Sequence, residues 1–315
     1  MWAEVGVAAV KLAVIAGMLL TVVPVMTWVE RRGAAFIQDR LGPNRVGPWG
    51  LLQPLADAVK LLFKEDVTPG HVSKGLYFLA PAVAVFVALS TFIVIPFAKA
   101  EGVTLFGVPL KGLIVAPDLN IGVLYLLALS SISVYGIVLA GWASNNKYAL
   151  LGGMRSAAQM ISYEVPLVIS VLGVIMMSGS LNLYTIAQAQ GDAFWQWNFL
   201  PQIIGFCVFV VASISELNRT PFDLPEAESE LVAGYHVEYS GFRFAFYMLA
   251  EYIYVYATAA ITTLLFLGAW HAPLPFLDFI PGLIWFLLKF SFVVFFLFWI
   301  RATLPRIRVD QLMSL

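Results

Sequence analysis

Residues 5–29 read VGVAAVKLAVIAGMLLTVVPVMTWV, an apolar run with one charged side chain, Lys11. About 20 apolar residues in a helix are enough to cross the hydrocarbon core of a bilayer. The run is longer than the apolar region of a signal peptide, which has roughly 7–15 residues, and no small-x-small cleavage motif ends it. We therefore interpret it as a membrane span that is retained.

The composition extends this interpretation to the whole chain. Of the 315 residues, 61% are hydrophobic and 12% are charged, whereas soluble proteins are about 45–50% apolar and about 25% charged. The net charge of −1 gives no indication of a nucleic-acid partner. The single cysteine, Cys207, excludes an internal disulfide and a self-contained iron–sulfur cluster.

Further apolar runs predict an all-α polytopic membrane protein with about seven transmembrane helices, folded as a single membrane domain over residues 1–315. No soluble domain fits between the runs, and we see no internal repeats. The predicted spans are roughly 5–29, 77–97, 119–142, 162–180, 199–217, 242–267 and 280–301.

The basic residues predict the orientation. Fourteen of the 18 Lys and Arg residues fall on one side of these spans and two on the other, with Lys11 and Lys289 inside spans. Because cytoplasmic loops carry the excess of Lys and Arg, we expect the N-terminus outside. The first loop, the loop over 218–241 and the C-terminal tail are then cytoplasmic.

The first cytoplasmic loop contains an amphipathic segment, WGLLQPLADAVKLLFKE at 49–65. Gln53, Asp57, Lys60 and Lys64 fall on one helical face, and the apolar residues take the other. The segment is too short and too polar to span, so we predict a helix at the membrane interface. It is either an interfacial anchor or the wall of a cleft whose polar stripe faces a partner or a ligand headgroup.

The segment ELNRTPFDLPEAESELVAGYHVE at 216–238 holds six of the nineteen acidic residues and one arginine, Arg219. Crowded or poorly hydrated carboxylates have raised pKa values and can hold protons near neutral pH. The segment is therefore either a solvated loop or a proton-handling site.

Charged residues also fall at the ends and in the interior of predicted spans. Glu30 and Arg31 end the first span and are typical of an interface anchor pair. Glu164 begins a span, whereas Glu251 lies about ten residues into one. Lys289 is equally deep and is expected to need a carboxylate partner or a water-filled cavity.

Four long motifs carry a family resemblance. They are RLGPNRVGPWGLLQPLADAVKLLFKE (40–65), GWASNNKYALLGGMRSAAQMISYE (141–164), ELNRTPFDLPEAESELVAGYHVEYS (216–240) and FWIRATLPRIRVDQL (298–312). In this order they resemble the membrane subunit of respiratory NADH:quinone oxidoreductase (complex I) that is designated 1 or H. Subunits of membrane-bound hydrogenases share the outline but resemble these loops less closely.

The resemblance implies a subunit of a proton-translocating enzyme, in the energy-transducing membrane, which in bacteria is the inner membrane. It implies that the chain forms much of the tunnel through which a quinone headgroup reaches an iron–sulfur cluster on a neighbouring chain. The implied partners are other membrane-arm subunits, the peripheral-arm subunits at the quinone site, and lipid. Iron–sulfur clusters, FMN and NADH would all be held by partner subunits, and this chain would hold no cofactor, metal or catalytic residue of its own.

Site residues follow by position from the resemblance. The quinone tunnel would involve Arg31, Arg40, Asp57, Lys60 and Tyr239. The proton-coupling carboxylates would be Glu164, Glu216, Asp223, Glu226, Glu228, Glu230, Glu238 and Glu251, with Arg155 and Arg219 as counter-charges. Family members usually continue into an eighth span, whereas this sequence stops at Leu315 without another apolar run.

The expected mechanism couples quinone reduction to these carboxylates. A negative quinone species ~4 Å from Glu226 or Glu228, at an effective dielectric near 20, raises their proton affinity by about 4 kcal/mol, or roughly three pKa units. A secondary transporter is an alternative, but it predicts inverted repeats that we do not see. An anchor for soluble subunits is another, and it predicts that the acids are replaceable.

Overall fold

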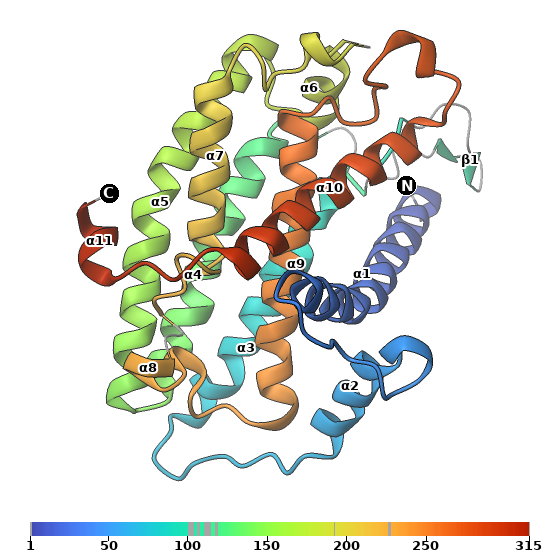
Figure 1. Cartoon of the computed structure of the whole chain (residues 1–315). Coiled ribbons are helices and arrows are strands. Elements are labelled where there is room, and N and C mark those ends of the chain that lie inside the picture. Colours follow the sequence, from blue (N-terminus) through green and yellow to red (C-terminus); the bar gives the residue numbers. More distant parts are fainter. Residues whose placement is uncertain are drawn as a thin grey trace.

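Apolar helices form most of the structure (Figure 1). The computed structural model describes residues 2–99, 104–105, 108–109, 115–116, 119–191, 193–225 and 228–314. Within these ranges, six helices are long and apolar enough to cross a membrane, and α7 is a shorter apolar helix. The seven helices are α1 (Trp2–Ile37), α3 (Lys74–Ser90), α4 (Gly122–Ala143), α5 (Lys147–Ser178), α7 (Ile203–Glu216), α9 (Gly241–Leu265) and α10 (Gly282–Thr303). The predicted class of polytopic α-helical membrane protein is confirmed.

Short elements connect these helices. Those before α5 are the 3-10 turn η1 (Pro48–Gly50), α2 (Gln53–Phe63), η2 (Thr91–Ile93) and the antiparallel pair β1 (Thr104–Leu105) and β2 (Val108–Pro109). Those after it are α6 (Leu183–Ala189), η3 (Phe194–Gln196), α8 (Glu228–Leu231), η4 (Gly234–His236), η5 (Pro275–Leu277) and α11 (Val309–Ser314).

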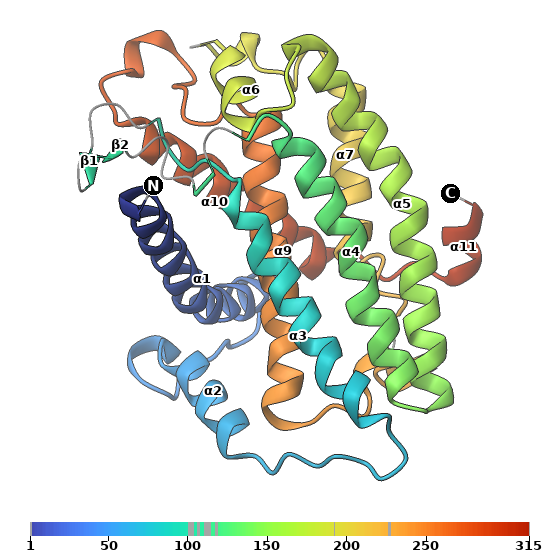
Figure 2. The ribbon, with the colours of Figure 1, turned by 180° about the vertical axis from the view of Figure 1, so that it is seen from behind.

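The helices pack as a bundle with two oblique members. Figures 1 and 2 show α3, α4, α5, α7 and α9 running roughly alongside one another, while α1 and α10 cross them at an angle. Small residues permit α3 and α4 to approach closely: a Cβ on Gly136 of α4 would lie 3.2 Å from the Cβ of Ala84 on α3. Such small-residue contacts are the usual means of helix association in lipid, where no hydrophobic force draws helices together.

Helix α5 differs from the prediction because it begins at Lys147 instead of residue 162. Asn146 caps its start by accepting a 3.0 Å hydrogen bond from the backbone N–H of Tyr148. Glu164 is therefore near the middle of a 32-residue helix rather than at the start of a span. Likewise, α1 continues to Ile37, so that Glu30 lies inside the helix and not at its end.

Helix α7 has only 14 residues, a length of about 21 Å, which is less than the ~30 Å hydrocarbon core. Its lower end stops partway along α5, and the chain continues as an irregular segment beside the same helix (Figure 1). The Gln159 side chain of α5 donates to the carbonyl oxygens of Ser215 (2.8 Å) and Phe222 (2.9 Å). Irregular backbone at membrane depth needs such partners within the protein.

The segment over 49–65 forms the helix α2, with η1 before it, as predicted; its place at the membrane interface stays a prediction. It lies beside α1 and contacts α9 (Figure 2). Its apolar residues Leu55, Val59, Leu62 and Phe63 are exposed in the isolated chain. This face is therefore accessible to lipid or to another apolar molecule.

Gly152 sets the distance between α5 and the turn η4. A Cβ at Gly152 would lie 2.7 Å from the Cα of Gly234, whereas one at the adjacent Gly153 would make only ordinary contacts. We expect Gly152→Ala to lower stability by about 1–3 kcal/mol through overpacking against backbone. The matched control Gly153→Ala gains the same helix propensity without the clash. Thermal unfolding of the two purified variants measures the difference, and equal melting temperatures would contradict the expectation.

His236 in η4 generates a prediction about pH. The side chain is buried against Tyr235 and Phe244, and burial lowers its pKa to about 4. The unfolded chain, with a histidine pKa of about 6.5, binds the proton first, so stability is lost as the pH falls from about 6.5 toward 4. The loss reaches on the order of 2 kcal/mol at pH 5.

We expect His236→Gln to lessen the drop in melting temperature between pH 7 and pH 5. His71→Gln is the control, because the His71 side chain is half-exposed. If the melting temperature of His236→Gln falls between pH 7 and pH 5 by as much as that of the unchanged protein, this histidine does not cause the loss of stability in acid.

Candidate site: an intramembrane carboxylate cavity

A cavity of about 120 Å³, measured as the space open to the centres of water molecules, lies between α3, α4, α5, α7 and α9. Two predicted carboxylates line it: Glu216, which ends α7, and Glu251, in the middle of α9. Its other polar lining residues are Thr91, Ser130, Ser133, Ser213, Asn218, Tyr235, Tyr247, Tyr254 and Thr258. A cavity with this room and these polar groups is suited to hold water within the helix bundle.

The corner after α7 places Glu216 on the cavity. Asn218 follows with a positive φ of 51°, and its side-chain NH2 donates to the Ser156 hydroxyl of α5 at 3.0 Å. Together with the Gln159 bonds, this contact fixes the corner on α5. Two of the polar residues in GMRSAAQM (153–160), Ser156 and Gln159, are thus buried hydrogen-bonding groups of a helix.

Glu164 lies beside the cavity without lining it. Its carboxylate accepts a hydrogen bond from the Ser131 hydroxyl of α4, and the neighbouring Ser130 lines the cavity. A pair of adjacent serines therefore separates Glu164 from the space that Glu216 faces. Three of the predicted carboxylates, Glu164, Glu216 and Glu251, are brought to one region of the bundle.

The counter-charge Arg219 is buried and pairs with Glu251 through its Nε. Its Nη1 is also 3.7 Å from Oε1 of Glu30. Glu30 forms an ion pair with Arg301 of α10 as well, and its Oε2 accepts a 2.6 Å hydrogen bond from Tyr252. Reasoning from the sequence missed Glu30, because a carboxylate next to an arginine near the end of an apolar run is typical of an interface anchor.

Among the other loop acids that the structure describes, Asp223 interacts electrostatically with Glu251, whereas Glu230 and Glu238 pair with other residues. Glu230 pairs with Arg155 at 2.7 Å, with both side chains about 40% exposed. Glu238 accepts a 2.7 Å hydrogen bond from the Asn146 side chain. Asp223 is half-buried, and its backbone carbonyl accepts from Arg306. Glu226 and the side chain of Glu228 lie outside the described part of the chain.

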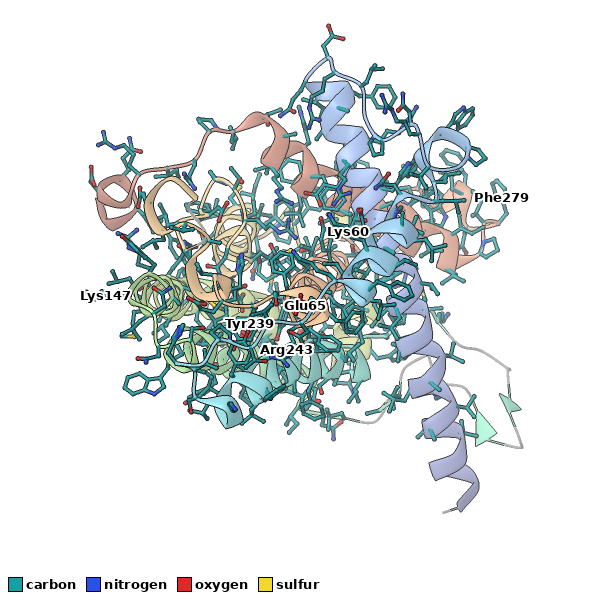
Figure 3. All side chains as sticks on the ribbon, turned by 90° about the horizontal axis from the view of Figure 1, so that it is seen from below. Lys60, Glu65, Lys147, Tyr239, Arg243 and Phe279 are labelled. Atoms are coloured by element: carbon teal, nitrogen blue, oxygen red, sulfur yellow. The ribbon has the colours of Figure 1, made fainter. Side chains whose placement is uncertain are left out.

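Three of the expected tunnel residues lie where α1 meets α2. Arg31 forms a 2.5 Å ion pair with Asp57, and the Gln53 side chain donates to the other Asp57 oxygen at 3.0 Å. Lys60 is exposed on the same helix, beside α1 in the view from below (Figure 3). Arg40 is also exposed and donates to Gln38 at 2.8 Å.

Tyr239 lies apart from these residues, nearer the middle of the bundle beside Arg243 (Figure 3). Its ring stacks on Tyr77 of α3 with centroids 4.2 Å apart. Its hydroxyl donates to the Tyr77 carbonyl oxygen at 3.3 Å, and burial raises the pKa of Tyr239 to about 12. It is therefore a neutral, buried hydrogen-bonding residue at neutral pH.

The expectation for Lys289 was wrong. Its Nζ donates to the backbone carbonyl oxygens of Ala269 (3.1 Å) and His271 (2.7 Å) and lies 3.7 Å from the centre of the Trp197 ring. Carbonyl dipoles and a cation–π contact hold the ammonium group in place of a carboxylate.

Comparison with known proteins identifies the family. The family model described as NADH dehydrogenase matches residues 10–315. The H subunit of NADH-quinone oxidoreductase from Brevibacillus brevis is 58% identical over 287 residues, which are 91% of this chain and 81% of that protein. The corresponding H subunit from Anoxybacillus flavithermus is 55% identical over 310 residues, covering 97% of this chain and 88% of that protein. The chain therefore belongs to the NADH dehydrogenase family, within the group formed by the H subunits of complex I.

Proposed function

We propose that this chain forms part of the quinone tunnel of NADH:quinone oxidoreductase and couples quinone reduction to proton translocation through its buried carboxylates. The observation that carries the proposal is the cavity on which both Glu216 and Glu251 lie. Carboxylates at membrane depth are costly and mark ion or proton pathways. The proposed reaction is taken from the similar proteins, which are named as subunits of an NADH-quinone oxidoreductase.

The cavity provides groups that can pass a proton between these carboxylates. Ser130 and Ser133 of α4 and Tyr254 of α9 line it together with the acids, and hydroxyl groups both donate and accept hydrogen bonds. A negative charge appearing ~10 Å away at an effective dielectric near 20 raises the proton affinity of a carboxylate by about 2 kcal/mol. That corresponds to roughly one pKa unit, enough to change proton occupancy.

The meeting of α1 and α2 supports the tunnel assignment. Helix α2 exposes an apolar face with Leu55 and Val59, while its polar side carries Asp57 in the ion pair with Arg31. A quinone has an apolar tail and a polar headgroup, and ligand sites typically combine an apolar wall with a few placed polar groups. Tyr239 would belong to a deeper part of the tunnel wall.

We expect Glu216→Gln and Glu251→Gln in the assembled complex to lower proton pumping driven by NADH and quinone by about tenfold or more, because each removes a proton-transfer group. Pumping in inverted membrane vesicles and quinone reductase activity are the measurements. Electron transfer from NADH to an artificial acceptor that bypasses quinone reports assembly and should be unchanged. Asp278→Asn, an exposed acid outside the cavity, is the control. Wild-type pumping and quinone reduction in either Glu variant would refute the proposal for that residue.

We expect Asp57→Asn to impair quinone reduction several-fold through a higher KM for quinone, because the Arg31 guanidinium loses its charged partner. Lys64→Gln, at the exposed end of the same helix, serves as the control. Steady-state kinetics over a range of quinone concentrations measures the effect. Unchanged KM and kcat in Asp57→Asn would contradict the proposal that α2 forms part of the tunnel wall.

A further inference from the structure

The end of α9 that lies beside α6 (Figure 1) forms one end of the carboxylate cavity. Leu265, the last residue of α9, and Leu183, the first residue of α6, both line the cavity. The basic residues predict that this side of the bundle faces outward. A path for protons through this end would connect the cavity directly to the outside, so the end has to be closed if the cavity is to hold protons.

Neutral side chains satisfy the carbonyl groups at the end of α9. They need donors, because the last four C=O groups of a helix have no partner within it. The Gln190 side chain donates to the carbonyl oxygen of Leu264 at 2.7 Å, and the Asn198 side chain donates to that of Leu265 at 2.8 Å. Both side chains are buried, so this part of the closure carries no charge.

Lys289 of α10 supplies the donors for the turn that follows α9. Its Nζ donates to the carbonyl oxygens of Gly268 (3.3 Å), Ala269 (3.1 Å) and His271 (2.7 Å). An ammonium group has three N–H donors, one more than a neutral amine, so three carbonyl acceptors favour the charged form. The ring of Trp197 covers the same nitrogen, with its centre 3.7 Å away, and is itself buried.

A charge is more than these carbonyl groups require, since Gln190 and Asn198 satisfy their neighbours without one. Lys289 lies seven residues after the start of α10, about 10 Å along the helix, and a charge within a membrane span is costly. A fixed positive charge repels other cations. At ~10 Å and an effective dielectric near 20, it lowers the occupancy by a second monovalent cation roughly tenfold. Positive groups placed in this way exclude protons and cations from membrane pores.

We propose that Lys289, covered by Trp197, is a proton barrier that seals the carboxylate cavity on the side where α6 lies. The barrier keeps protons held at the cavity from exchanging directly with that side of the membrane. The inference rests on the proposed function, since such a barrier matters only to a cavity whose protons take part in translocation.

The test is the passive proton permeability of the purified complex in liposomes, without NADH or quinone. A potassium gradient with valinomycin imposes the voltage, and an enclosed pH-sensitive dye reports proton entry. Lys289→Gln keeps a neutral donor but removes the charge, whereas Lys289→Arg keeps the charge. Lys74→Gln, at the exposed start of α3, is the control. Electron transfer from NADH to an artificial acceptor, measured separately, reports assembly.

We expect Lys289→Gln to raise the permeability at least about tenfold, because the repulsion of cations is lost. Lys289→Arg and Lys74→Gln should remain as tight as the unchanged complex. A residue that only capped α9 would lower the melting temperature when replaced, without a leak in the assembled complex. Unchanged permeability in Lys289→Gln, or an equal leak in the Gln and Arg variants, would overturn the inference.

Trp197→Leu keeps Lys289 and covers the case in which Lys289→Gln does not assemble. We expect a several-fold rise in permeability, because the ammonium group loses its cover against water. Permeability equal to that of the unchanged complex would again overturn the inference.

Proton pumping by Glu216→Gln, measured during turnover, separates the two proposals. If this variant pumps normally while Lys289→Gln leaks, the proposed function fails and the barrier stands. If Glu216→Gln loses pumping while Lys289→Gln stays tight, only the barrier fails.

Discussion

A guanidinium group held between two carboxylates inside a helix bundle is the interaction on which the rest of this structure depends. Removing charges from water costs several kcal/mol per ion, and only close, well-paired partners compensate for it. Arg219 meets this condition with Glu30 and Glu251. Because these three residues belong to α1, to the segment after α7 and to α9, the pairing also fixes how those segments sit against one another. The same ion pairs thus hold three segments together and give Glu251 a charged partner beside the cavity.

The class of fold and the approximate places of the spans could be predicted, because a run of apolar residues has few alternatives to a membrane helix. Helix boundaries could not. The stretch before residue 162 contains Gly152, Gly153, Arg155 and Gln159, a composition that predicts a loop, yet it forms the first half of α5. Gln159 is stable inside this helix because its side chain donates hydrogen bonds to carbonyl oxygens at the end of α7 and in the irregular segment after it, more than fifty residues later in the sequence. The residues around Gln159 give no indication of these distant partners.

The same limit applies to the site. Glu216 and Glu251 could be predicted, because carboxylates at or within apolar runs are costly wherever they fold. Glu30 could not, since its partners Arg219 and Arg301 are distant in the sequence. Lys289 shows the converse case. Its position within an apolar run could be read from the sequence, but its partners are backbone carbonyl oxygens. Every residue has a carbonyl oxygen, so the sequence does not indicate which ones will bind the lysine. Long-range pairing, rather than residue chemistry, is what the structure adds.

The short length of α7 has a consequence for the energetics of the bilayer. A helix of about 21 Å covers only part of the ~30 Å insulating layer, and the polar corner at its end takes up the remainder within the protein. Most of any voltage across the membrane would then fall over the thinner apolar stretch above Glu216. A proton that reaches this carboxylate from the polar side has then crossed little of the electric field, and most of the electrical work of translocation belongs to the step across that apolar stretch.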